Sequence, residues 1–297
     1  MSVIDPDHDD GGTMSGTTPL QDRLVDCVDD AAREASLARA AEVVREGKVV
    51  VLPTDTVYGV GADAFDVVAV AMVLAAKHRG REMPPPVLVP NPRTVDGLAT
   101  DVPMYARILM RQFWPGPLTL VVRVQPSLQW DLGETNGTVA LRMPDDEIAL
   151  ELLAEVGPMA VTSANVTGHP AATTAQEALD QLGGAVAAYL DGGPRTGGAP
   201  STILDCTGEE PVVLRLGALS AEEIRAVLGT TVLHDSPPAA QEGAEDAPDA
   251  VEEPTEDTGR GDLADLVGSV APSGVLAPAD SLRTVAAPRS SGATTTP

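Results

Sequence analysis

The chain has 297 residues, a formal net charge of −25 from 44 acidic and 19 basic residues, two cysteines and seven aromatic residues. No stretch approaches the roughly 20 uninterrupted apolar residues that a membrane span needs. The first ten residues carry four aspartates, where a secretory signal has basic residues and then an apolar run. We therefore predict a cytoplasmic protein without membrane contact. Cys27 and Cys206 are too few for a disulfide framework, and we predict no protein-bound metal.

Composition divides the chain into three parts. Residues 230–297 carry 12 acidic and three basic residues and no aromatic residue, so they cannot bury enough apolar surface to offset the entropy of ordering them. We predict a disordered N-terminus over 1–19, a folded domain over 20–229 and an acidic disordered tail over 230–297. The tail is interpreted as a solvating extension, and competition for a cationic cavity is the alternative.

Apolar residues at helical spacing predict a helix over 25–46, and a short β-branched run predicts a buried strand over 48–53. Further helices are expected at 66–77, 105–113, 145–156, 174–182 and 220–228, and further strands at 86–90, 118–124, 138–143, 159–162, 188–190, 202–205 and 212–216. Ser220 and Glu223 predict a capping box. This mixture without a strict βαβ repeat predicts an open α/β or α+β sheet.

The common catalytic motifs are absent. The glycines at 59 and 61 fail the GxGxxG pattern, and no GxxxxGK[ST] phosphate loop occurs. The four histidines are scattered, which disfavours a Ser/His/Asp hydrolase. If the protein uses ATP, it must hold the nucleotide in another way.

Polar residues gather where predicted strands and helices end. Hydroxyl-rich stretches at 53–59 and 162–168 are either turns that satisfy their own backbone or parts of a ligand site. The three cations in 77–81 either complement a helix dipole or bind phosphate or carboxylate. Arg142 and Arg215 lie within apolar strands, where each needs an anionic partner from the protein or from a ligand.

Seven motifs stand in one order: PTDTVYG at 53–59, KHRGREMP at 77–84, FWPGPLTLV at 113–121, TVALRMP at 138–144, TSANVTG at 162–168, STILD at 201–205 and VLRLG at 213–217. In this order the chain resembles the YrdC-like L-threonylcarbamoyladenylate synthases, in their short single-domain form. The resemblance implies an α/β fold, a twisted open mixed sheet with flanking helices around a concave, locally positive cavity. It implies that L-threonine, bicarbonate and ATP are joined into threonylcarbamoyl-AMP with release of pyrophosphate, for N6-threonylcarbamoyladenosine formation in ANN-decoding tRNAs.

The resemblance also implies the site residues. Those that match ATP-contacting positions are Lys77, Arg79, Thr138, Asn165, Thr173 and Arg215, and Lys77 with Arg79 forms the catalytic cationic pair. Those that match threonine-holding positions are Thr56, Arg142, Ser163 and Ser201. Mg²⁺ is expected to arrive with the nucleotide. The expected partners are L-threonine, bicarbonate, ATP and downstream tRNA threonylcarbamoyl-transfer proteins, with a weak contact to tRNA.

The chain departs from the family pattern in one loop. Met83 stands where many members have an asparagine that contacts ATP, Pro85 where a leucine follows the proline, and Leu88 where a histidine lies near threonine. These three contacts do not carry over. Arg81 is an additional cation in the same loop, and we expect it to replace part of the lost polar contact.

Two other functions stay open. The first is a non-catalytic module that binds double-stranded RNA or tRNA, although the net charge of −9 over 37–229 and the scarcity of aromatic residues disfavour strong RNA affinity. The second is a carbamoyl-transfer relative that works on carbamoyl phosphate. Such relatives carry acylphosphatase-like and zinc-finger regions, which this sequence lacks.

Overall fold

The computed structural model describes residues 19–196 and 198–235. Most of the N-terminus predicted over 1–19 and of the tail predicted over 230–297 lies outside the described residues. The folded part continues past the predicted boundary at 229, because Leu233 is buried in the core and β12 (His234–Asp235) pairs with β11 (Val212–Arg215). None of the described helices is long and apolar enough to cross a membrane.

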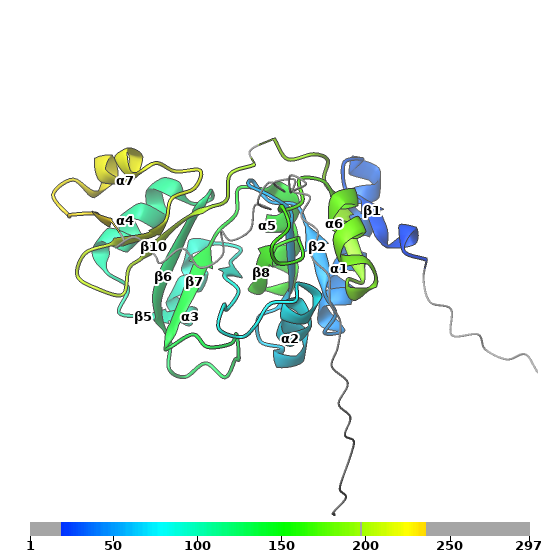
Figure 1. The fold of residues 1–297 in the computed structure, drawn as a ribbon, viewed down its shortest axis with the longest axis horizontal. Helices are drawn as coiled ribbons and strands as arrows, with labels where there is room; N and C mark the ends of the chain where they lie inside the picture. The colour runs from blue at the N-terminus through cyan, green and yellow to red at the C-terminus, as the bar shows by residue number, and fades with distance from the viewer. Residues whose placement is uncertain (1–18, 197, 236–297) are drawn as a thin grey trace, which may run out of the picture. The chain divides into compact units, whose positions relative to one another are not determined.

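One mixed sheet organises the described residues (Figure 1). Its strand order is β1-β9-β2-β3-β8-β4-β7-β6-β10-β11-β12, and β5 pairs with β6 beside this path. The other strands are β1 (Leu24–Asp26), β2 (Val50–Leu52), β3 (Gly59–Asp63), β4 (Val87–Leu88), β5 (Ala99–Thr100), β6 (Leu118–Val124), β7 (Thr138–Arg142), β8 (Met159–Ser163), β9 (Ala188–Asp191) and β10 (Thr202–Asp205). Parallel pairs such as β6/β10 stand beside antiparallel pairs such as β6/β7. The predicted α/β class with an open mixed sheet is confirmed.

Helices cover both faces of the β2 side of the sheet. The helices are α1 (Asp30–Arg45), α2 (Val67–Ala76), α3 (Val95–Leu98), α4 (Met104–Phe113), α5 (Glu147–Val156), α6 (Ala175–Leu182) and α7 (Ala221–Leu228). Successive strand residues point to opposite faces. Val50 and Leu52 accordingly pack with α1 and α5, whereas Val49 and Val51 pack with α2 and α6. The predicted flanking helices are confirmed.

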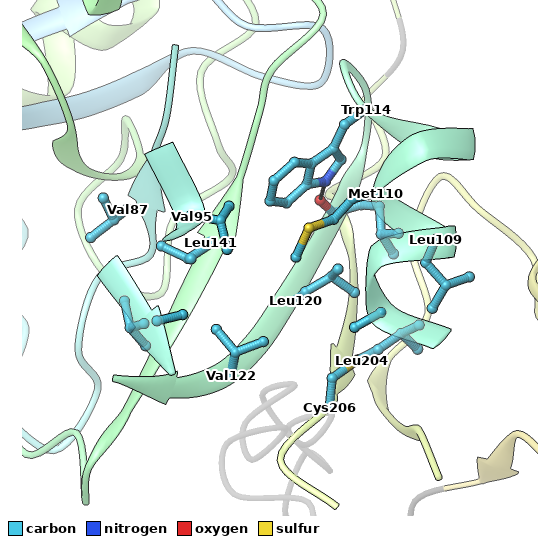
Figure 2. Close-up of a cluster of buried hydrophobic side chains, with 14 of the residues drawn as sticks. Val87, Val95, Leu109, Met110, Trp114, Leu120, Val122, Leu141, Leu204 and Cys206 are labelled. Atoms are coloured by element: carbon cyan, nitrogen blue, oxygen red, sulfur yellow. Dashed lines mark hydrogen bonds between the residues drawn. The ribbon is translucent and has the colours of Figure 1, made fainter. Parts of the chain in front are cut away.

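A third cluster packs α4 and α7 against β6, β7 and β10 (Figure 2). Leu120 and Val122 of β6 belong to this cluster, together with Leu109 and Met110 of α4. The alternation of the strand puts Thr119 and Val121 on the opposite face, where they line a cavity. The sheet therefore separates a packed core from a hollow face.

The start of the first predicted helix is wrong. The predicted helix over 25–46 begins too early, because residues 24–26 form the edge strand β1, which pairs with β9. The helix itself begins after Asp29, whose side chain accepts a hydrogen bond from the backbone N–H of Ala31. At the other end of the domain, the predicted capping box of α7 at Ser220 and Glu223 is confirmed.

Strand β3 is missing from the predicted elements because glycine is disfavoured in strands. Here the glycines are needed: a Cβ on Gly61 would lie 2.5 Å from the Val161 side chain. This close approach lets β3 pair with β8, with Gly59 opposite Ser163. The pairing brings the motif at 53–59 beside the motif at 162–168, which builds the site.

Candidate active site

A cavity of about 520 Å³, here called the main cavity, lies on the hollow face of the sheet. The predicted site residues that line it are Thr56, Arg79, Thr138, Arg142, Ser163, Ser201 and Arg215. In the described part of the chain its lining contains three arginines and no carboxylate. A concave surface with this charge favours an anionic ligand.

Arg142 lies at the end of β7 and is 7% exposed. Its Nη2 pairs with the Asp55 carboxylate, its Nη1 donates to Thr56 Oγ1 at 3.1 Å, and its Nε donates to the Gly116 carbonyl at 3.1 Å. Burial lowers the pKa of Arg142, and Asp55 opposes that effect. The anionic partner that an arginine in an apolar strand requires is therefore a protein carboxylate.

Sequence reasoning misses Asp55, although it stands in the motif at 53–59. Its Oδ1 binds Arg142 and also accepts a hydrogen bond from the backbone N–H of Asp145, while its Oδ2 is buried without a partner among the described residues. The unmet need of Arg142 for an anion is the signal that could have found this residue. Asp55 fixes the orientation of the guanidinium.

Arg215 and Ser201 meet at the other wall of the main cavity. Arg215 Nη2 and Nε both donate to the Ser201 carbonyl, at 2.8 and 3.2 Å, and Ser201 Oγ lies 2.9 Å from Thr119 Oγ1. Burial lowers the pKa of Arg215, and the charge of Arg142 adds to this effect. The described ion pairs include no carboxylate partner for Arg215, so its charge stays available to a ligand.

Arg79 completes the group of cations in the main cavity. Its Nη1 donates to Thr162 Oγ1 at 3.0 Å, and no residue in the described part of the chain bonds to its buried Nε. Burial lowers the pKa of Arg79, with Glu82 opposing that effect and the charge of Arg215 adding to it. Burial lowers the pKa of all three arginines, and the charge of a neighbouring arginine adds to this effect for Arg79 and Arg215. A bound anion would stabilise their charged forms.

Lys77 and Asn165 do not line the main cavity. Lys77 is 2% exposed, and its Nζ donates to the Ser163 carbonyl, to the Asn165 carbonyl at 2.7 Å and to Asn165 Oδ1 at 2.9 Å. Asn165 Nδ2 in turn donates to the His169 carbonyl at 2.7 Å. Both side chains hold the loop after β8, whose Ser163 does line the cavity.

Thr173 also lies apart from the lining. Its Oγ1 donates to Glu177 Oε2 at 3.0 Å and its backbone N–H to the same oxygen at 2.7 Å, just before α6. These bonds lower the pKa of Glu177. The structure thus places Thr173 in the cap of α6 rather than in the cavity wall.

The loop that departs from the family pattern at Met83, Pro85 and Leu88 forms part of the wall of the main cavity. Pro85 and Leu88 line it, whereas Met83 does not and is 41% exposed. The expectation that Arg81 supplies a cation there is wrong. Arg81 Nη2 pairs with Asp131 Oδ1 at 2.6 Å, outside the cavity lining.

Arg81 instead fastens two loops to each other. Its carbonyl accepts the backbone N–H of Glu134 at 2.8 Å, and Gly133 packs against that carbonyl with φ at +110°. The loop that contains Gly133 and Glu134 also contains Leu132 and Thr135, which line the main cavity. Sequence reasoning misses these two wall residues because their stretch lies between predicted strands.

Replacing Gly133 with alanine is expected to lower the free energy of unfolding by about 1–3 kcal/mol. A Cβ there would lie 2.5 Å from the Arg81 carbonyl oxygen, in a left-handed backbone conformation. Urea unfolding of the full chain measures the loss. Gly97→Ala is the matched control, because a Cβ at Gly97 meets nothing within 4 Å. Equal stability of the two variants would contradict the tight loop contact.

Comparison with known proteins shows the family to which this chain belongs. The Sua5/YciO/YrdC family, described as "Telomere recombination", matches residues 42–217. The chain belongs to the Sua5/YciO/YrdC family. The family match spans both hydroxyl-rich motifs and all three arginines of the main cavity.

Relatives and solved structures of the family cover most of the described residues. A Mycobacterium tuberculosis protein with the provisional name threonylcarbamoyl-AMP synthase is 55% identical over 204 residues, which cover 69% of this chain and 94% of that protein. The threonylcarbamoyl-AMP synthase of Bacillus subtilis is 40% identical over 209 residues, 69% of this chain and 60% of that one. The structure of Pyrococcus abyssi Sua5 complexed with L-threonine aligns with a TM-score of 0.67 and 38% identity, over 71% of this chain and 62% of that one.

Proposed function

We propose that this chain is an L-threonylcarbamoyladenylate synthase, a nucleotidyltransferase that makes threonylcarbamoyl-AMP and pyrophosphate from L-threonine, bicarbonate and ATP. The observation that carries the proposal is the main cavity, with three arginines and a set of hydroxyls from separate strand ends. The names of the relatives and the threonine complex of the Pyrococcus abyssi structure support it. We place the reaction in the cytoplasm, before the proteins that transfer the threonylcarbamoyl group to tRNA.

We assign the threonine carboxylate to Arg142. A guanidinium has five N–H donors, and three of those on Arg142 are used by Gly116, Thr56 and Asp55. Two N–H groups remain for a carboxylate, and the three bonds hold them in place before the substrate arrives. Thr56, Ser163 and Ser201 supply hydroxyls for the rest of the amino acid.

We assign the nucleotide to the side of Arg79, Arg215 and Thr138, all of which line the main cavity. A direct contact between ATP and Lys77, Asn165 or Thr173 requires these side chains to leave their present partners. We therefore propose that Lys77 and Asn165 act by holding the loop after β8 in place. Thr173 acts through the start of α6.

The chemistry requires positioning and charge more than a protein nucleophile. The neutral amine of threonine attacks the carbon of bicarbonate, water leaves, and a carbamate oxygen then attacks the α-phosphorus of ATP as pyrophosphate leaves. The bicarbonate and the three phosphates bring several negative charges into one cavity. Arg79 and Arg215 offset these charges as they shift toward the leaving pyrophosphate.

The metal that accompanies ATP is proposed to come with the nucleotide. The described residues include no group of three or more His, Cys, Asp or Glu side chains that could hold a metal ion. The lining of the main cavity offers hydroxyls and guanidinium groups, which are poor ligands for Mg²⁺.

Pyrophosphate release by the purified chain with ATP and Mg²⁺ is expected to require both L-threonine and bicarbonate. Omission of either substrate is expected to reduce the rate to background, because the carbamate is the nucleophile. Mass detection of the adenylate identifies the product. Release without threonine would contradict the proposal, and tRNA binding without any release would favour the RNA-binding alternative.

A further inference from the structure

A second cavity, of about 400 Å³ and here called the basic cavity, lies between α1, α2 and the turn before β9. Its lining residues are Arg23, Arg39, Val43, Lys48, Val49, Met72, Gly184, Ala185 and Ala187. Three of these lining residues are cations, and none of the lining residues in the described part of the chain is a carboxylate. Lys48 pairs with Glu46 beside the cavity at 2.6 Å, so the two arginines are the cations without a carboxylate partner among the described residues. The basic cavity shares no lining residue with the main cavity, so the proposed reaction does not account for it.

The two arginines of the basic cavity are fixed but not neutralised. Arg23 Nη1 donates to the carbonyls of Gly184 and Val186 at 3.0 and 2.6 Å, and Arg39 Nη2 donates to the Asp22 carbonyl at 3.1 Å. Neither guanidinium takes part in an ion pair among the described residues, whereas Arg33, on the same helix as Arg39, binds two glutamates. Two oriented arginines without a carboxylate form a site for an anion.

An exposed apolar helix face adjoins the basic cavity. All ten residues of α2 are apolar, and Val67, Val68 and Met72 are 44%, 67% and 38% exposed. Met72 is shared, because it also lines the basic cavity. A surface with cations at one side and apolar side chains at the other fits a segment that combines carboxylates with apolar residues.

The chain itself contains such a segment close in sequence to Arg23. Residues 3–10 read VIDPDHDD, with an apolar pair followed by four aspartates, and residues 1–18 contain no lysine or arginine. The described chain begins at Pro19, four positions before Arg23. The nine residue-to-residue steps from Asp10 to Pro19 reach at most about 30 Å, and a tether of this length gives an effective concentration on the order of millimolar.

We propose that residues 3–10 dock on this surface of their own chain. The aspartates take the place of carboxylate partners for Arg23 and Arg39, and the apolar pair Val3 and Ile4 covers the exposed face of α2. The order of the segment agrees with this arrangement, because its acidic end is nearer to Pro19 and Arg23. The docked segment blocks the binding of other polyanions to the two arginines. Its affinity for the surface decreases as the salt concentration increases.

The test uses the full chain and a labelled synthetic peptide of residues 1–18. A variant with Asp5, Asp7, Asp9 and Asp10 all replaced by asparagine frees the surface. Fluorescence anisotropy at low salt is expected to show the peptide binding this variant at least about tenfold more tightly than the wild type, whose surface is filled by its own segment. Equal affinity for both chains, or binding to neither, would overturn the proposal.

The location of the peptide is tested by charge removal in the asparagine variant. Arg39→Gln with Lys48→Gln is expected to weaken peptide binding about tenfold, since both side chains line the basic cavity. The matched control is Arg93→Gln with Arg111→Gln, two exposed arginines outside that cavity, which should leave the affinity unchanged. Loss of affinity in both pairs would point to unspecific charge attraction and reject the site. Concentration-dependent dimers of the wild type in sedimentation would show instead that a second copy supplies the segment.

Discussion

Replacing Arg142 with methionine is expected to lower kcat/KM for L-threonine by about 100-fold or more, because the variant loses both the proposed contact with the threonine carboxylate and a cation of the main cavity. It is also expected to lower the free energy of unfolding by about 3–5 kcal/mol. The cause is Asp55, whose side chain is 13% exposed and would be left without its partner. Pyrophosphate release at varied threonine concentration and urea unfolding measure the two effects separately.

A second variant separates the loss of activity from the loss of stability. Asp55→Asn combined with Arg142→Met removes both charges of the pair, so most of the stability is expected to return. Turnover is expected to stay low, because the threonine carboxylate still has no guanidinium. Recovery of turnover together with stability would show that Arg142 acts only as a structural partner of Asp55.

The elements of the fold can be predicted from the sequence where apolar residues repeat with a clear helical or strand period. The run LTLVVRV predicts a strand over 118–124, and β6 has these bounds, because its alternate residues pack against α4. Strands β1 and β3 are not predicted in this way. Strand β1 has only three residues and lies at the sheet edge. Strand β3 contains glycines that leave room for the Val161 side chain of the neighbouring strand, and only the structure shows this contact.

The residue types of the candidate site can be predicted from the sequence, but their spatial arrangement cannot. The motifs place hydroxyls and arginines at strand ends, and most of these residues do line the main cavity. The roles of Lys77 and Arg81 depend on partners far along the chain. Asn165 reaches Lys77 through the β3/β8 pairing, and Asp131 reaches Arg81 through a loop. Spacing within one motif cannot predict such partners.

Replacing Lys77 with methionine tests whether this buried amine acts through the loop after β8. Burial, and then the charge of Arg79, lower the pKa of Lys77 to about 8. The variant leaves both oxygens of Asn165 that Lys77 binds without this donor, so the loop is expected to shift and turnover to fall by about 100-fold or more. Pyrophosphate release measures that loss.

The pH dependence of stability gives a readout that is independent of activity. Between pH 8 and 10.5 the unfolded chain keeps a proton on Lys77 that the folded chain releases, because the folded pKa is about 8 and the ordinary value is 10.5. The free energy of unfolding therefore rises with pH in this window for the wild type, relative to Lys77→Met. Lys48→Met is the matched control, since Lys48 is exposed and pairs with Glu46. Loss of the rise in Lys48→Met would show that the rise does not come from Lys77. A curve for Lys77→Met that runs parallel to that of the wild type would mean that the Lys77 amine keeps its ordinary pKa, and that its charge is not suppressed by the loop that encloses it.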